Sequence, residues 1–182
     1  MPPSQLLQIY LELQWLEPAI WRRVIVPDTI TLKQLHKAIQ ITMGWSDKHL
    51  HEFVITDKRY GTPESGTQGI FPEKNIRLGQ CLGNLKTLGY IYDFGDYWEF
   101  NLRVEKKLPL VATEHYPICI GGARAAPPED VGGPPGFLDF LEAISNPMHP
   151  GHQDVIEWYG AGFNAEAFDA EQINQRLIKT SR

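Results

Sequence analysis

The stretch from Tyr90 to Val104 reads YIYDFGDYWEFNLRV, and the rest of the chain is organised around it. The pattern predicts two short strands joined by a tight turn at 93–96, where Gly95 supplies a backbone shape that residues with a Cβ resist. Apolar and polar residues alternate along the second strand, which indicates one buried face. We expect that face to be the floor of the core, below a hairpin tip with two carboxylates. It consists of Trp98, Phe100, Leu102 and Val104.

Three more strands are expected upstream of this hairpin. Residues 7–13 alternate between apolar and polar side chains, and residues 21–26 are rich in β-branched types. Because Pro18 marks a turn between them, the two segments predict an antiparallel hairpin. The third strand runs from His49 to Ile55. Its alternation directs four side chains to one face, namely His49, His51, Phe53 and Ile55.

One helix has clear signals at both ends. Residues 32–43 carry apolar side chains at helical spacing, which predicts one buried face. Thr31 and Gln34 fit a capping box at its start, and Gly44 is a typical residue just past a helix end. Three shorter helices are expected in the C-terminal part, at 137–144, at 155–159 and after Asp169.

Together these elements predict an α+β fold. A mixed or antiparallel sheet of about five strands would carry one long capped helix, an arrangement that is β-grasp-like by analogy. Residues 57–88 and 109–135 are rich in glycine and proline, so we expect loops there, with a short strand or helical turn near 76–82. The 182 residues are interpreted as one domain, with a sheet-and-helix core at 1–107 and a loop-rich helical extension at 108–182.

Charge and composition exclude several classes of protein. The net charge is -5 and the pI about 5.7, and the 17 Lys and Arg are scattered, which disfavours binding to bare nucleic acid and favours a protein partner. No apolar run is long enough to cross a membrane, and no secretory signal opens the chain. Cys81 and Cys119 form no C-x-x-C pair. We therefore expect a soluble cytoplasmic protein with reduced thiols.

Five motifs occur along the chain in a fixed order: WRR at 21–23, TLxxLH at 31–36, GWxxxHLHxF at 44–53, YDFGDxW at 92–98 and PPEDxGG at 127–133. This set resembles the plasmid pRiA4b ORF-3-like family over nearly the whole chain. The resemblance implies a link to mobile genetic elements and no established activity. Two positions depart from the family pattern: Phe100 stands where a histidine is common, and Ala126 where a cysteine is common. Both departures weaken a metal site built from those positions.

The residue types also offer candidate metal ligands. His49 and His51 stand two apart on the expected strand, so both imidazoles can reach one divalent metal ion. Asp93 or Asp96 at the hairpin tip would add a carboxylate. The alternative is structural, because histidines that face a core are also satisfied by hydrogen bonds to Tyr or Asp.

Two further segments have simpler interpretations. His149, His152 and Cys119 supply only three zinc ligands, and we expect the two histidines to cap or flank a helix. The loop at 127–133 is expected to be rigid, with carboxylates that accept backbone hydrogen bonds. A phosphate-binding role for it is disfavoured because Glu129 and Asp130 would repel an anion.

Three functional hypotheses remain. The first is a non-catalytic binding or accessory protein with a groove lined by Trp45, Tyr92 and Trp98. The second is a metal-dependent hydrolase of phosphoesters that uses His49 and His51 with Asp93 or Asp96. The third is a structural domain without a ligand. Protein-kinase activity is excluded, since the Asp-Phe-Gly at 93–95 has none of the other kinase motifs around it.

Overall fold

The computed structural model describes residues 5–63, 69–111 and 115–180, with Thr180 described by its backbone alone. Its centre is one eight-stranded sheet with the order β5-β4-β3-β6-β7-β1-β2-β8. Neighbouring strands are antiparallel except for the parallel pair β4 and β5. The strands are β1 (Leu6–Leu13), β2 (Ile20–Pro27), β3 (His51–Ile55), β4 (Lys58–Gly61), β5 (Ile70–Pro72), β6 (Thr87–Tyr92), β7 (Trp98–Leu108) and β8 (Ile118–Ala123).

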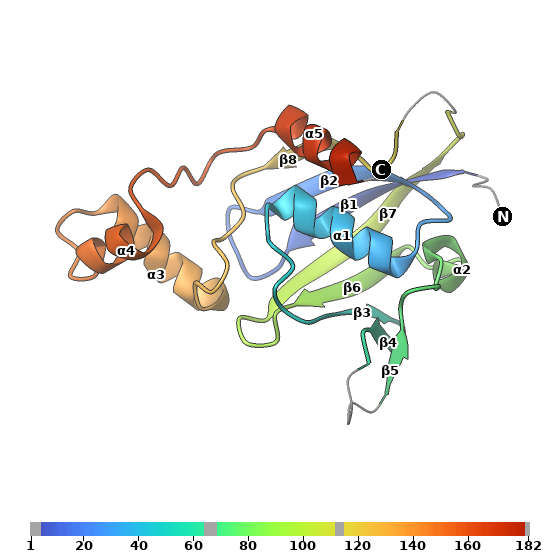
Figure 1. The fold of residues 1–182 in the computed structure, drawn as a ribbon, viewed down its shortest axis with the longest axis horizontal. Coiled ribbons are helices and arrows are strands. Elements are labelled where there is room, and N and C mark those ends of the chain that lie inside the picture. Colours follow the sequence, from blue (N-terminus) through green and yellow to red (C-terminus); the bar gives the residue numbers. More distant parts are fainter. Residues whose placement is uncertain (1–4, 64–68, 112–114, 181–182) are drawn as a thin grey trace.

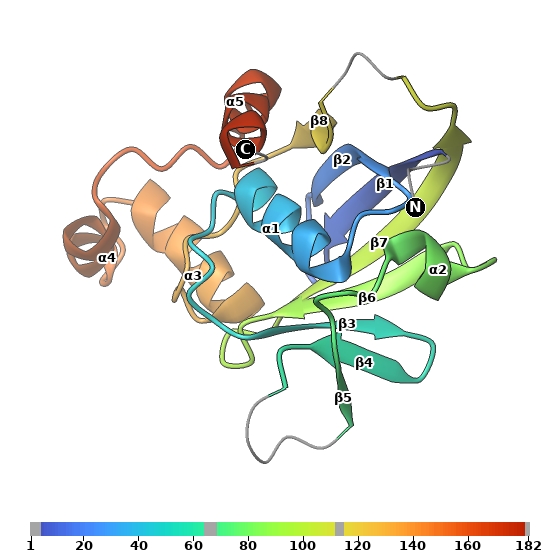
Figure 2. The ribbon, with the colours of Figure 1, turned by 45° about the vertical axis from the view of Figure 1, so that its right-hand side comes forward.

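The helices lie on one face and beyond one end of this sheet. The longest of those that cover it, α1, crosses the face, and α5 lies beside α1 next to β8 (Figures 1 and 2). Two others, α3 and α4, pack on one another past the end of the sheet (Figure 1). The helices are α1 (Leu32–Met43), α2 (Leu78–Leu82), α3 (Gly133–Ser145), α4 (His152–Tyr159) and α5 (Ala170–Thr180).

The α+β class and the mostly antiparallel sheet are confirmed, whereas two details of the prediction are wrong. The sheet has eight strands within the described ranges, not about five. No single long helix dominates, because α1 has 12 residues and α3 has 13. Three strands, β4, β5 and β8, were not predicted. They are short and lie among glycines and prolines, so no alternation of apolar and polar residues marks them in the sequence. Since β8 belongs to the sheet, the sheet does not end at residue 107.

The predicted central hairpin is present as β6 and β7, and most of its floor is buried: Trp98, Phe100 and Leu102 are each at most 1% exposed, whereas Val104 is only partly buried. The reason given for its turn is wrong. Asp93 and Tyr97 adopt the left-handed conformation, with φ of 58° and 55°, whereas Gly95 is not among the residues with positive φ. The Asp93 carboxylate accepts the Gly95 backbone N–H at 2.9 Å, which holds the turn closed.

The start of α1 confirms the capping box. Thr31 accepts the backbone N–H of Gln34, and the Gln34 side chain accepts the backbone N–H of Thr31. Gly44 ends the helix with a left-handed φ of 74°. The apolar side of the helix is buried against the sheet, so the histidine on that side, His36, is only 2% exposed.

The opposite face of the sheet is solvated and charged. Arg23 donates two hydrogen bonds to the Glu105 carboxylate, at 2.7 and 3.0 Å, and its guanidinium lies over the ring of Tyr10. Mainly because of Arg23, the pKa of Glu105 falls to about 2. An antiparallel sheet with one dry and one wet face is common. The candidate chemistry therefore lies on the helix-covered face.

The C-terminal part covers the β8 edge and the end of the hairpin. Asn174 of α5 bonds to both the backbone N–H and the carbonyl of Cys119, which satisfies the open edge of β8. Helix α5 follows Asp169 as expected, and the Asp169 side chain caps it by accepting the Gln172 backbone N–H. Helix α3 begins at Gly133, earlier than predicted, because prolines are tolerated in a first turn. Both cysteines are free thiols, and no helix in the described ranges has the length and apolar character to cross a membrane.

Candidate functional site

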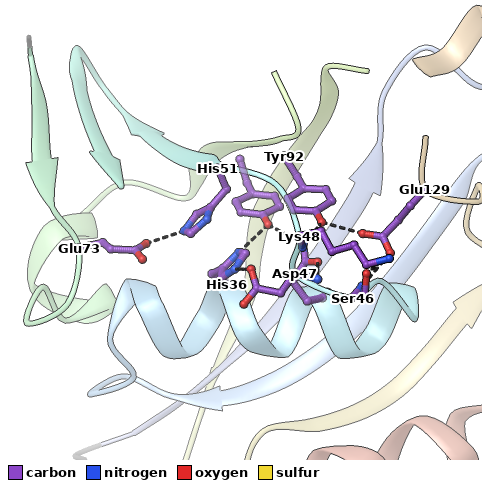
Figure 3. Close-up of polar contacts among 10 residues, drawn as sticks. His36, Ser46, Asp47, Lys48, His51, Glu73, Tyr92 and Glu129 are labelled. Carbon is purple, nitrogen blue, oxygen red and sulfur yellow. Dashed lines mark hydrogen bonds and ion pairs between the residues drawn. The ribbon is translucent and has the colours of Figure 1, made fainter. Parts of the chain in front are cut away.

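Two groups of histidines and carboxylates lie near the start of β3. The first, here called the buried cluster, is made of His36, Asp47, His51 and Glu73, which Figure 3 labels, and of Tyr90, whose hydroxyl bonds His36. The second, here called the open cluster, is made of His49, Asp93 and Asp130. Each contains three side chains whose ligand atoms lie within 4.8 Å of one another, which makes both candidates for a metal ion.

In the buried cluster His36 projects from α1 toward the sheet, and both of its ring nitrogens are bonded (Figure 3). A carboxylate has no proton to donate, so Nε2 carries the hydrogen and donates to Asp47 Oδ1 at 2.7 Å. Nδ1 then accepts from the Tyr90 hydroxyl at 2.8 Å, and that hydroxyl oxygen accepts from Gln40 at 3.0 Å. Every polar group in this chain of bonds has a partner, so His36 has no free lone pair for a metal.

Electrostatics also keep His36 neutral. The pKa of His36 is lowered to about 4, mainly by burial and further by His51. The hydrogen bond to Asp47 raises the pKa, but it offsets only part of these two effects. The two imidazoles are stacked, with centroids 3.4 Å apart and planes 3° from parallel. Two charged rings at that separation would repel strongly. On the other side of the stack, His51 Nε2 bonds Glu73 Oε2 at 2.8 Å.

The open cluster differs because its histidine lacks a hydrogen-bond partner. His49 Nε2 is itself buried and makes no hydrogen bond within the described residues. Two carboxylate oxygens nevertheless face it, Asp130 Oδ1 at 3.0 Å and Asp93 Oδ2 at 3.6 Å. A buried polar atom without a partner is costly. His49 Nε2 therefore faces two acceptors without forming a hydrogen bond to either of them.

The two acidic residues of the open cluster are held by unusual backbone. Asp93 has a φ of 58° and Asp130 a φ of 62°, both in the left-handed region that most residues avoid. Such conformations persist where the surrounding structure enforces them, and they gather at functional sites. Here one carboxylate oxygen of Asp93 is fixed by Gly95, which leaves the other free to face His49.

The loop at 127–133 is anchored next to the open cluster. Glu129 accepts hydrogen bonds from the Tyr92 hydroxyl at 2.7 Å and from the backbone and side chain of Ser46 (Figure 3). Burial raises the pKa of Tyr92, and the hydrogen bond to Glu129 raises it further, so the Tyr92 hydroxyl keeps its proton and donates it. Trp45 donates its indole N–H to the Pro127 carbonyl at 2.8 Å. As expected, a carboxylate of the loop accepts a backbone hydrogen bond, and these contacts anchor the segment that carries Asp130.

The predicted four-residue metal site divides between the clusters. His49 and Asp93 come together as expected, whereas His51 turns to Glu73 and the stack with His36. Asp96 accepts the backbone N–H of Gly132 at 3.0 Å and faces neither histidine within the candidate groups. The contacts of His51 fit the structural interpretation, and those of His49 fit the interpretation as a ligand.

The predicted aromatic groove is wrong in part. Tyr92 and Trp98 are fully buried, and Trp45 is 8% exposed, so the three cannot together line an open surface. Trp45 alone reaches the wall of a cavity beside the 127–133 loop. The other histidines flank helices as expected: His149 accepts the Gly151 N–H, and His152 bonds the Ala143 carbonyl.

Sequence reasoning missed Asp130 as a neighbour of His49 and also missed every partner of His51. Asp130 was visible in the PPEDxGG motif, and His36 in TLxxLH, but neither spacing revealed what each side chain faces. Asp47 and Glu73 lie in loops with no signal of their own. Glu73 is 2% exposed, and its Oε1 has no partner within the described residues.

Comparison with known proteins fits this geometry. The model of the plasmid pRiA4b ORF-3-like proteins matches residues 5–172. The chain belongs to that family. Its open cluster draws one residue each from the segments 44–53, 92–98 and 127–133, which carry the resemblance in the sequence.

Two known proteins are similar to this chain over nearly its whole length. The chain is 36% identical over 178 residues to the uncharacterized protein y4hQ of Sinorhizobium fredii, covering 96% of this chain and 91% of that protein. It is also similar to the crystal structure of MM3350, a protein of unknown function from Methanosarcina mazei Go1. That match has a TM-score of 0.85 and 37% identity, and covers 93% of this chain and 98% of the other.

Proposed function

We propose that this pRiA4b ORF-3-like protein is a non-catalytic binding protein whose ligand site is organised by a divalent cation in the open cluster. One observation carries the proposal: the buried Nε2 of His49 has no hydrogen-bond partner in the described residues, yet faces two carboxylates. A cation between these three groups would satisfy the imidazole and the two negative charges together.

The distances suit such an ion. Ligands at about 2.1 Å from a tetrahedral ion lie about 3.4 Å from one another. The two His49 separations, 3.0 and 3.6 Å, fall on either side of that value. One imidazole with two carboxylates is a donor set that zinc and manganese accept. In the buried cluster Glu73 Oε1 also lacks a partner among the described residues, but both nitrogens of His36 are occupied, so the group of His36, Asp47 and His51 does not offer three free ligand atoms.

A metal-dependent hydrolase of phosphoesters is the second candidate. It is favoured by the ligand count, since three protein ligands leave a coordination position for the water that such enzymes activate. Asp130 is 62% exposed at its side chain, which keeps that position within reach of solvent. The ligands would be His49, Asp93 and Asp130, without His51 or Asp96. A cytoplasmic location and a link to mobile elements would suit either candidate.

Calorimetric titration of chelator-treated protein with Zn²⁺ and Mn²⁺ tests the proposal. We expect one ion per chain, and at least a hundredfold loss of affinity in His49→Ala, since one of three ligands is removed. His149→Ala is the matched control, because this histidine bonds only its own turn among the described residues. Equal affinity in the two variants, or no bound ion at all, would sink the cation site and favour a structural domain without a ligand.

An assay with a chromogenic phosphodiester separates the two candidates. If the metal-loaded protein hydrolyses bis(p-nitrophenyl) phosphate, and Asp93→Asn abolishes turnover while the chain stays folded, the hydrolase candidate replaces the binding one. If the ion binds and no turnover follows with either metal, the non-catalytic binding role stands.

A further inference from the structure

A groove runs from the open cluster along α4. It consists of two cavities, of about 670 and about 410 Å³. Asp130 and Trp158 line both, so the cavities adjoin on the two sides of the same indole. The larger lies between the 127–133 loop and residues 158–167, and the smaller between α3 and α4, which stand apart from the sheet (Figure 1).

The groove presents large aromatic surfaces to solvent. Trp158 is 51% exposed and Tyr159 is 45% exposed, and both line the larger cavity. The side chains are nevertheless held in place, because the edge of each ring packs on Phe140, at 6.0 and 5.4 Å between centroids. No residue of α4 is buried. Exposed aromatic side chains on a helix without buried residues indicate a surface that another molecule covers.

The rim of the groove is acidic. Asp139, Asp154 and Asp130 line the smaller cavity, and Lys48 is the one Lys or Arg among the described residues that line either cavity. Asp139 and Asp154 are exposed, and neither forms an ion pair with any residue in the described ranges. A negative groove raises the local concentration of cations.

We infer that this groove binds a Lys- and Arg-rich segment of a partner protein. Aromatic faces attract ammonium and guanidinium groups, and free carboxylates pair with them, so the groove combines the two features that recognise such side chains. A second copy of this chain is a poor occupant, because 22 acidic residues outnumber the 17 basic ones. Nucleic acid is repelled by the same acidic rim. The inference deepens the proposed binding role, on which it rests, by naming the kind of partner.

Fluorescence anisotropy with a labelled Arg- and Lys-rich peptide tests the groove, using the full chain loaded with zinc and a Glu-rich peptide of equal length as counterpart. We expect binding of the basic peptide alone. The double variant Asp139→Asn and Asp154→Asn should weaken it about tenfold, on the scale of two exposed ion pairs. Trp158→Ala should weaken it about fivefold, on the scale of a cation–π contact.

The matched control is the double variant Glu142→Gln and Glu157→Gln. It removes the same charge from the same two helices at positions that do not line either cavity. If both double variants weaken binding equally, the negative charge of the protein as a whole explains the binding, and a specific site in the groove does not. Preference for the Glu-rich peptide or for single-stranded DNA would also overturn the inference.

Failure of the groove and failure of the cation site give different results. Since Asp139 and Asp154 do not belong to the open cluster, their double variant should still take up zinc as the unaltered protein does. If zinc binds and the peptide does not, only the inference about the groove is refuted. If the peptide binds selectively to the groove and no zinc binds, only the proposed cation site is refuted.

Discussion

The buried and open clusters contain two histidines, His51 and His49, that are only two residues apart in the sequence, yet they are opposite kinds of site. His51 lies under α1, 9% exposed, in a stack that is bonded on both sides. His49 lies in the loop before β3 with its side chain 29% exposed and its Nε2 without a hydrogen bond in the described part of the chain. The comparison teaches that a satisfied histidine supports the fold, whereas an unsatisfied one beside carboxylates is available to a ligand.

The start of β3 explains why the two histidines separate. Alternation of faces holds only inside a strand, and β3 begins at His51. Before it, the Leu50 carbonyl accepts the Asp93 backbone N–H at 2.8 Å, which ties this loop to the hairpin turn. His49 is thereby directed to the turn and the 127–133 loop instead of to α1.

The largest effect is expected from His36→Ala. This change leaves a cavity under α1 and removes the bonds to Tyr90 and Asp47, so we expect the free energy of unfolding to fall by about 4 kcal/mol. Denaturant unfolding measures it. His49→Ala is the comparison, and its metal-free form should lose less than about 1 kcal/mol. A similar loss in both variants would contradict the distinction between the clusters.

A second prediction concerns pH. The pKa of His36 is about 4 in the folded chain, below its usual 6.5, so the unfolded chain binds more protons between these values. Stability should therefore fall as the pH drops from 6.5 to 4, by about 3 kcal/mol from this group. His36→Gln should lack this part of the pH dependence, because an amide does not titrate. Asp47, His51 and Glu73, which face His36, are unchanged in that variant, so an identical profile in both proteins would refute the assignment.

A third prediction tests which aspartate belongs to the open cluster. Asp130→Asn removes a charge that faces His49 at 3.0 Å, so we expect a ten- to hundredfold loss of zinc affinity, about 1.4 to 2.7 kcal/mol. Asp96→Asn removes the same charge from the neighbouring hairpin tip, where the carboxylate bonds Gly132, and should leave the affinity within about threefold. Calorimetry on both variants decides between them, and a reversed order would restore the site expected from the sequence.

Much of the fold was visible in the sequence where local signals were strong. The cap of α1, the alternation in β1 and β7 and the β-branched residues of β2 placed those elements correctly, because each pattern matches the geometry of its element. The short β5 and β8 depend on long-range pairing, with β4 and β2, which no local pattern encodes. The left-handed conformation at Asp93, in place of Gly95, is likewise imposed by the turn as a whole.

The site was only half visible for a similar reason. His49 and Asp93 were recognised as candidates from their residue types. Which other aspartate faces His49, Asp130 or Asp96, depends on how the 127–133 loop returns to the hairpin. That return is set by Glu129 bonding Tyr92 and by Gly133, where a Cβ would collide with the Asp96 carbonyl oxygen. Contacts of this kind join segments more than thirty residues apart, and a spacing within one segment carries no information about them.

The smallest effect is expected at His152, a histidine that the sequence also offered as a ligand. Its Nδ1–H donates to the Ala143 carbonyl at 2.7 Å, so His152→Ala should lower the free energy of unfolding by about 1 kcal/mol. Zinc affinity should not change, because the imidazole faces no carboxylate in the candidate groups. Thermal unfolding and calorimetry of one preparation give both numbers. A loss of zinc affinity here would mean that histidines outside the open cluster bind the ion, and that an unpartnered ring nitrogen is a poor guide to the site.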